Sequence, residues 1–162
     1  MVINKTTIQQ TVAAAFQKFR WTGPALHLVM RLVQPTLSIG VVGVVVNSQG
    51  QILIVKHVFH PRKPWGLPGG WIGRNESPNH TVQRELKEEL ELAVEVDKLL
   101  MAEVTFRNHL DIAYLCRPLG SIGKLSIELL DYGWFDPGAL PPLNLFNYQA
   151  IERALSITKT VS

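Results

Sequence analysis

Residues 70–92 read GWIGRNESPNHTVQRELKEELEL, and they say more about the fold than any other part of the chain. Ser77 is a favourable helix N-cap and Pro78 suits the first helical position. At roughly 100° per residue, one face of the following helix is apolar and has to meet a core. That apolar face consists of Val82, Leu86 and Leu90. The segment therefore predicts an amphipathic helix from Pro78 to about Leu90, entered through a glycine-containing loop.

Three carboxylates flank the apolar face of this helix. Glu85, Glu88 and Glu89 stand three and four residues apart or side by side, so they gather on one flank. Like charges packed together weaken a helix, and a hard divalent cation with oxygen ligands would relieve the repulsion. The alternative is an ordinary acidic surface. A position beside the core and next to a glycine-rich loop is unusual for unpaired carboxylates, so the metal site and the ordinary acidic surface both stay open at this point.

The spacing of the fixed residues resembles the Nudix box. Gly70, Glu76, the pair Arg84-Glu85 and the pair Glu88-Glu89 stand at the intervals of that box, and Trp65-Gly66-Leu67-Pro68-Gly69-Gly70 resembles its usual entry. One position departs from the family pattern, because Glu91 stands where a glycine is usual before the closing Leu92. A glycine there serves the tight exit from the helix. We therefore expect an altered helix end and an intact metal face.

The resemblance implies a fold and a reaction. The fold is of the α/β (α+β) class, with a mixed β-sheet held between helices. The reaction is metal-dependent hydrolysis of a phosphoanhydride bond in a nucleoside diphosphate linked to another group, such as ADP-ribose or a nucleotide sugar. The resemblance also implies that Mg²⁺, or Mn²⁺ in its place, is held by Glu85, Glu88 and Glu89. A backbone carbonyl of Gly69 or Gly70 would assist.

The resemblance further assigns supporting roles to Arg84 and Glu76, which would fix the loop and the carboxylates. A surface ion pair is the less favoured alternative for Arg84. The general base stays open between the box and a loop elsewhere. The candidates are Glu88, Glu89, Glu103, Asp111, Glu128 and Asp131.

The segment from His57 to Trp65 leads into the box and is the best candidate for substrate binding. Arg62 and Lys63 offer positive charge to phosphates, with His57 nearby. Trp65 or Phe59 offers a ring for stacking. The alternatives are a solvent-exposed basic pair and a tryptophan that packs in the core.

Outside the box, changes of hydrophobic period mark further elements. Helices are predicted at Thr6–Phe19, about Ala25–Val33 and Leu145–Ile157; strands are predicted at Ser38–Val46, Gln51–His57, Val94–Phe106, Asp111–Arg117 and Lys124–Phe135. The resemblance covers most of residues 37–157. We therefore expect a helical extension at residues 1–36 and a Nudix domain at residues 37–162.

Composition limits the other classes of function. Hydrophobic residues make up 46% of the 162-residue chain, which indicates a globular protein. One cysteine, Cys116, excludes an intrachain disulfide and a cysteine-rich zinc site, and with no signal-like start it indicates a cytoplasmic protein. The first 75 residues carry eight basic residues and no acidic one, which suggests an anionic partner or merely a solvated basic face.

Several alternatives remain beside the enzyme. A catalytically silent Nudix-fold module that binds a nucleotide or regulates is disfavoured by the complete carboxylate set. No nucleic-acid-binding motif is identifiable. Residues 5–33 carry cations and aromatic rings that suit an anionic membrane surface, although packing on the domain or forming a homodimer contact is favoured.

Overall fold

The computed structural model describes residues 28–30, 33, 36–59 and 63–160. The chain divides into two units, Met1–Thr36 and Leu37–Ser162, and both sheets belong to the second unit. In the first unit the described residues are Leu28–Met30, Val33 and Thr36; all are exposed, and all but Thr36 are helical. The predicted helix Thr6–Phe19 lies outside the described residues. The helical extension at residues 1–36 therefore stays a prediction.

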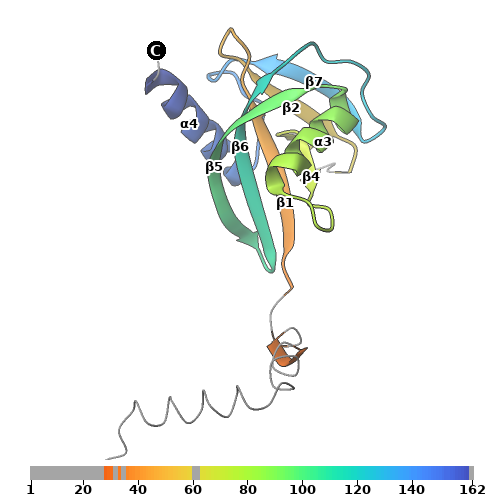
Figure 1. Ribbon diagram of the computed structural model, residues 1–162. Helices are drawn as coiled ribbons and strands as arrows, with labels where there is room; N and C mark the ends of the chain where they lie inside the picture. Colours follow the sequence, from red (N-terminus) through yellow and green to blue (C-terminus); the bar gives the residue numbers. More distant parts are fainter. Residues whose placement is uncertain (1–27, 31–32, 34–35, 60–62, 161–162) are drawn as a thin grey trace, which may run out of the picture. The chain divides into compact units, whose positions relative to one another are not determined.

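The larger sheet has four strands in the order β4-β1-β6-β5 (Figure 1). They are β1 (Ser38–Val45), β4 (Gly69–Trp71), β5 (Val94–Phe106) and β6 (His109–Pro118). β1 pairs in parallel with β6 and antiparallel with β4, and β5 and β6 form an antiparallel hairpin. At the hairpin turn, Asn108 adopts a φ of 59°, in the left-handed region that asparagine tolerates.

The smaller sheet has three antiparallel strands in the order β3-β2-β7. They are β2 (Ile52–His57), β3 (Trp65–Gly66) and β7 (Leu129–Phe135). A turn stabilised by Asn47 joins β1 to β2, because the Asn47 side-chain oxygen accepts hydrogen bonds from the backbone N–H groups of Gln49 and Gln51, both at 2.9 Å.

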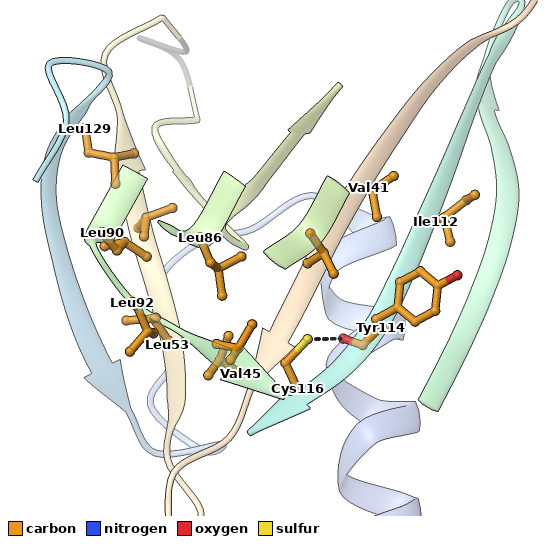
Figure 2. Packing of buried hydrophobic residues seen from close by; sticks show 13 residues of the cluster. Val41, Val45, Leu53, Leu86, Leu90, Leu92, Ile112, Tyr114, Cys116 and Leu129 are labelled. Carbon is orange, nitrogen blue, oxygen red and sulfur yellow. Dashed lines mark hydrogen bonds between the residues drawn. The ribbon is translucent and has the colours of Figure 1, made fainter. Parts of the chain in front are cut away.

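The two helices described within residues 37–162 pack on opposite faces of the four-stranded sheet. Alternate residues of β1 point to opposite faces, and Val45 lies in the core that contains α3 (Pro78–Leu90), while Val44 lies in the core that contains α4 (Leu145–Thr160). Figure 2 shows Leu86 and Leu90 extending from α3 toward Leu53 of β2 and Val45 of β1. The α3 core therefore joins the two sheets and fixes the flank that carries the carboxylates.

The predicted mixed class is confirmed, with the strands arranged as two sheets. The box helix has its predicted bounds, since Ser77 caps it and Pro78 opens it. Within the expected strand Lys124–Phe135, only Leu129–Phe135 is β-structure, and the short strands β3 and β4 lie in the segment expected to be a loop. No helix among the described residues is long and apolar enough to span a membrane.

The expected alteration of the helix end is wrong. α3 ends at Leu90, and Glu91 itself adopts the left-handed conformation, with φ 52° and ψ 22°. The Glu91 N–H donates to Lys87 O at 3.0 Å, and the Leu92 N–H donates to Leu86 O at 3.2 Å. A non-glycine residue is strained in this conformation, and the Glu91 carboxylate offsets part of that cost by accepting a hydrogen bond from the Lys124 N–H at 3.2 Å.

Candidate active site

Arg84 is the centre of the carboxylate cluster. Its guanidinium binds Glu76 through two hydrogen bonds, Nε to Oε1 at 2.9 Å and Nη2 to Oε2 at 3.0 Å. Its Nη1 contacts Glu85 Oε1 at 2.8 Å and Glu88 Oε2 at 2.9 Å. These hydrogen bonds raise the pKa of Arg84 above its usual value, and the hydrogen bonding to Glu76 contributes most. The arginine therefore joins the loop carboxylate to two carboxylates of the helix.

Glycines make the loop fit against these side chains. A Cβ at Gly70 would lie 2.4 Å from the Glu85 carboxyl carbon, and a Cβ at Gly69 would lie 2.1 Å from Val41 O on the neighbouring strand. The Gly73 N–H donates to Glu76 Oε2 at 2.8 Å, and a Cβ there would lie 2.9 Å from the same oxygen. The absence of a side chain at these three glycines therefore lets the loop approach both β1 and the box carboxylates.

Glu89 is the most buried of the three helix carboxylates. Only 5% of the residue is exposed, and its Oε2 accepts a hydrogen bond from the Gly69 N–H at 3.1 Å. Burial, with smaller contributions from neighbouring carboxylates such as Glu85 and Glu128, raises the pKa of Glu89 to about 8. Burial is also the main cause that raises the pKa of Glu85. Glu88, in contrast, is exposed. Burial thus makes ionisation of both carboxylates costly, and a further cation beside them would offset that cost.

The chemistry of this donor set fits a hard cation. All three side chains offer oxygen atoms, which are the ligands that Mg²⁺ takes in proteins. Among the residues that the structure describes, no three His, Cys, Asp or Glu side chains are grouped closely enough to hold a metal ion as they stand. Arg84 engages the carboxylates of Glu85 and Glu88, and Glu89 turns to the Gly69 backbone.

Two neighbouring cavities adjoin the cluster. The smaller has a volume of about 590 Å³ and is lined by all three helix carboxylates, together with Glu128 and Ile127. The larger has a volume of about 750 Å³ and lies along β1, β3 and the start of α4. The residues that line both cavities are His57, Phe59, Gly69, Gly70 and Trp71. A ligand in the larger cavity would therefore lie next to the carboxylates.

The predicted substrate-binding residues fall mainly on the larger cavity. His57, Lys63 and Trp65 line it, and Arg62 lies outside the described residues. Trp65 also packs edge to face on Phe135, with ring centroids 5.6 Å apart. Its ring therefore contributes to the core as well as to the cavity wall.

The four candidate bases outside the box are separated by the fold. Glu128 lines the smaller cavity with the box carboxylates, whereas Asp111 lines the larger one. Glu103 pairs with Arg153 at 3.6 Å, and Asp131 accepts a hydrogen bond from the Tyr132 N–H at 2.8 Å.

Sequence reasoning did not identify several residues of the larger cavity. They are Trp71, Phe106, His109, Asn144 and Asn147. Trp71 lies inside the box, and its place one residue after Gly70 on a short strand was the one available signal. The others come together only through pairing of distant segments.

The comparisons with known proteins agree with this geometry. The sequence model described as NUDIX domain matches residues 36–154. The chain belongs to the Nudix family. A MutT-like protein of Streptomyces ambofaciens is 34% identical over 117 residues, which span 72% of this chain and 68% of that relative.

Other Nudix relatives differ in length and activity. The 8-oxo-dGDP phosphatase NUDT18 of Mus musculus is 32% identical over 106 residues, which are 62% of this chain and only 33% of that protein. An ADP-ribose pyrophosphatase of Streptococcus suis has a solved structure with a TM-score of 0.63 and 28% identity, covering 78% of this chain and 94% of that one. The expectation of a Nudix pyrophosphohydrolase, an enzyme acting on acid anhydrides, is confirmed at the level of the family.

Proposed function

We propose that this Nudix enzyme hydrolyses the diphosphate linkage of a nucleoside diphosphate joined to another group, such as ADP-ribose or a nucleotide sugar, in the presence of Mg²⁺ or Mn²⁺. The observation that carries the proposal is the position of Glu89. It is a nearly buried carboxylate beside Glu85, at the wall of a cavity that continues into a space of about 750 Å³. A cavity of that size accommodates a nucleotide-sized ligand.

Each part of the site has a role in this proposal. Glu85, Glu88 and Glu89 would hold the cation, with a backbone carbonyl of Gly69, and the cation supplies charge compensation for the diphosphate and a lowered pKa for the attacking water. Arg84 and Glu76 hold the loop and the helix carboxylates in fixed positions relative to each other. His57 and Lys63 line the route along which the phosphates would lie.

For the proton acceptor we propose Glu128. It lines the same cavity as the box carboxylates, and it is exposed, so it can exchange its proton with solvent. The water oxygen forms a bond to phosphorus, the bridging P–O bond breaks, and one proton passes from the water to Glu128. A Glu128→Gln variant should lower kcat at least about a hundredfold with little change in KM, given the usual contribution of general-base catalysis. An unchanged kcat would return the role to Glu88 or Glu89.

The proposed function is tested by phosphate release from a panel of ADP-ribose, nucleotide sugars, nucleoside diphosphates and triphosphates, and dinucleoside polyphosphates. Each substrate is assayed with Mg²⁺, with Mn²⁺ and with chelator, and phosphatase is added to reveal monophosphate products. Glu89→Gln is the test variant. Glu95→Gln, an exposed carboxylate on β5, is the matched control.

We expect metal-dependent turnover that is lost in Glu89→Gln and retained in Glu95→Gln. Turnover restricted to nucleoside triphosphates would replace the proposed substrate class. No turnover by a folded sample on any member of the panel, together with nucleotide binding, would favour a silent binding module. We also propose that the enzyme is cytoplasmic and that its substrate is a small nucleotide. Contact of residues 5–33 with a membrane stays a prediction, and so does the formation of a homodimer.

A further inference from the structure

The larger cavity has an aromatic wall made of Trp71, Phe106 and His109. His109 is 5% exposed and lies against both other rings, with its centroid 4.3 Å from Phe106 in a stacked arrangement and 4.9 Å from Trp71 in a tilted one. Trp71 and Phe106 are each 60% exposed. A buried ring thus supports two rings that leave much of their apolar surface open to the cavity, and such surface binds planar ligands by stacking.

A chain of hydrogen bonds holds an acidic side chain beside this wall. His109 Nε2 lies 3.0 Å from Asp111 Oδ1, and the Thr105 hydroxyl donates to Asp111 Oδ2 at 2.6 Å. On the other side of the imidazole, Ser38 Oγ lies 2.7 Å from His109 Nδ1. Each Asp111 oxygen has one partner here, and a carboxylate oxygen accepts two hydrogen bonds, so both oxygens keep accepting capacity.

Strand register places the carboxylate and the tryptophan on one line across the sheet. Gly40 of β1 pairs with Trp71 of β4 on one side and with Asp111 of β6 on the other. Neighbouring strands lie about 4.8 Å apart, so the two flanking backbones are roughly 10 Å apart. A Cβ at Gly40 would lie 2.6 Å from Asp111 Oδ1, so the missing side chain lets the carboxylate lie over β1. Asp111 keeps 20% of its side chain exposed and lines the cavity.

Trp71 connects this wall to the reactive groups. It lines the larger cavity together with Asp111, and it lines the smaller cavity together with Glu85 and Glu89. Its carbonyl oxygen also accepts a hydrogen bond from Arg84 Nη2 at 3.2 Å. If the base of a nucleotide stacked on Trp71, the phosphates of that nucleotide would therefore lie near Glu85 and Glu89.

We propose that the aromatic wall is the base subsite of the enzyme, where Trp71 stacks on the nucleobase and Asp111 selects a guanine-type edge. The inference rests on the proposed function and narrows its substrate, because it places guanine nucleotide sugars ahead of ADP-ribose, whose base is adenine. Guanine presents two adjacent donors, a ring N–H and an exocyclic amino group, to a carboxylate that only accepts. Adenine presents an acceptor nitrogen at the ring position, which an ionised carboxylate repels.

The test measures binding of mononucleotides to the full chain by isothermal calorimetry, because mononucleotides have no anhydride bond to cleave. The probes are GMP, AMP and ribose 5-phosphate. The variants are Trp71→Ala, Asp111→Asn and the control Val104→Ala, which alters an exposed residue of β5 outside the cavity. Phe106→Ala addresses the same wall if circular dichroism shows that Trp71→Ala does not fold.

We expect GMP to bind about tenfold more tightly than AMP, in line with a bidentate base contact, and ribose 5-phosphate to bind more weakly than both. Asp111→Asn should bring the GMP to AMP ratio close to one. Trp71→Ala should weaken both nucleotides about tenfold without changing their ratio, as expected for lost stacking. Val104→Ala should alter neither value.

Equal binding of GMP and AMP by the unaltered chain would overturn the inference, as would a ratio that survives Asp111→Asn. Binding of ribose 5-phosphate as tight as that of GMP would assign Asp111 to the sugar instead and would also overturn it. The two proposals fail separately. Selective GMP binding without turnover of any diphosphate would contradict the proposed function alone, and turnover without purine selectivity would contradict this inference alone.

Discussion

Glu76 shows at the scale of one residue how the box loop is held. Hydrogen bonds from Arg84 and from the Gly73 N–H lower the pKa of Glu76 to about 2, from 4.5. A carboxyl with a lowered pKa in the folded state stabilises that state when it is ionised. The contribution is therefore fully present above about pH 4.5 and is lost as the pH falls toward 2.

A Glu76→Gln substitution tests this contribution. The variant should be less stable than the unaltered chain at pH 7 and pH 5, and the difference in free energy of unfolding should shrink between pH 4.5 and pH 2. Urea unfolding at a series of pH values measures it. Glu152→Gln, at an exposed position of α4, is the control and should follow the unaltered chain. A difference that grows with acidity would contradict the assignment.

The single thiol is predicted to be inert. Cys116 is fully buried in the α3 core, and burial, with a smaller contribution from Asp97, raises its pKa to about 12. Thiol reagents attack the thiolate, so the folded protein at pH 8 should react far more slowly than the same protein in guanidinium chloride. Absorbance after addition of a chromogenic disulfide measures both rates. Equal rates would show that this core opens readily.

The sequence predicts some residues of the site and not others, for a physical reason. Glu85, Glu88 and Glu89 were predicted to act together because helical spacing gathers them on one flank, whereas the supporting roles of Glu76 and Arg84 were expected from the resemblance to the Nudix box. Trp71 and Phe106 were not predicted, because they meet through pairing of β4, β1, β6 and β5, and nothing in the spacing of one strand reveals its partner. Local periodicity thus identifies the carboxylates, and the base subsite needs the fold.

At the scale of elements, the end of α3 stores strain at Glu91. Glycine accepts the left-handed conformation without cost, whereas a residue with a Cβ does not. Glu91→Gly and Glu91→Ala both remove the carboxylate that binds the Lys124 N–H, so their comparison isolates the backbone. The glycine variant should be the more stable by about 1 kcal/mol. Thermal denaturation of both measures the difference, and equal stabilities would show that the turn relaxes.

Elements also show where periodic patterns stop being informative. The box helix was predicted with both ends because Ser77 and Pro78 mark its start and a three-turn apolar stripe runs to Leu90. Strands β3 and β4 have two and three residues, too few to display a period, and they lie among prolines and glycines. They are strands because β3 pairs with β2 and β4 pairs with β1 at the edges of the two sheets.

For the whole molecule, the proposed cation should stabilise the fold. Glu85 and Glu89 repel each other beside the core, and an ion that binds only the folded state adds stability in proportion to the logarithm of its concentration. Addition of Mg²⁺ should raise the melting temperature, and chelator should reverse the rise. Glu89→Gln should reduce the effect, whereas Glu95→Gln should retain it. Differential scanning calorimetry measures all three, and a rise unchanged in Glu89→Gln would argue for a different binding site.

The parallel pairing of β1 with β6 also bears on how quickly the enzyme can assemble. Ser38 and its neighbour His109 are 71 positions apart along the chain. Closing so long a segment costs chain entropy before any hydrogen bond between those strands can form. The β5–β6 hairpin and α3 are local and can form first. Because Trp71 on β4 and Asp111 on β6 are brought together only through β1, the wall that contains them is complete only after this slow closure. Catalytic competence should therefore be among the last properties to return during refolding, with the millisecond-to-second kinetics typical of chains rich in distant contacts.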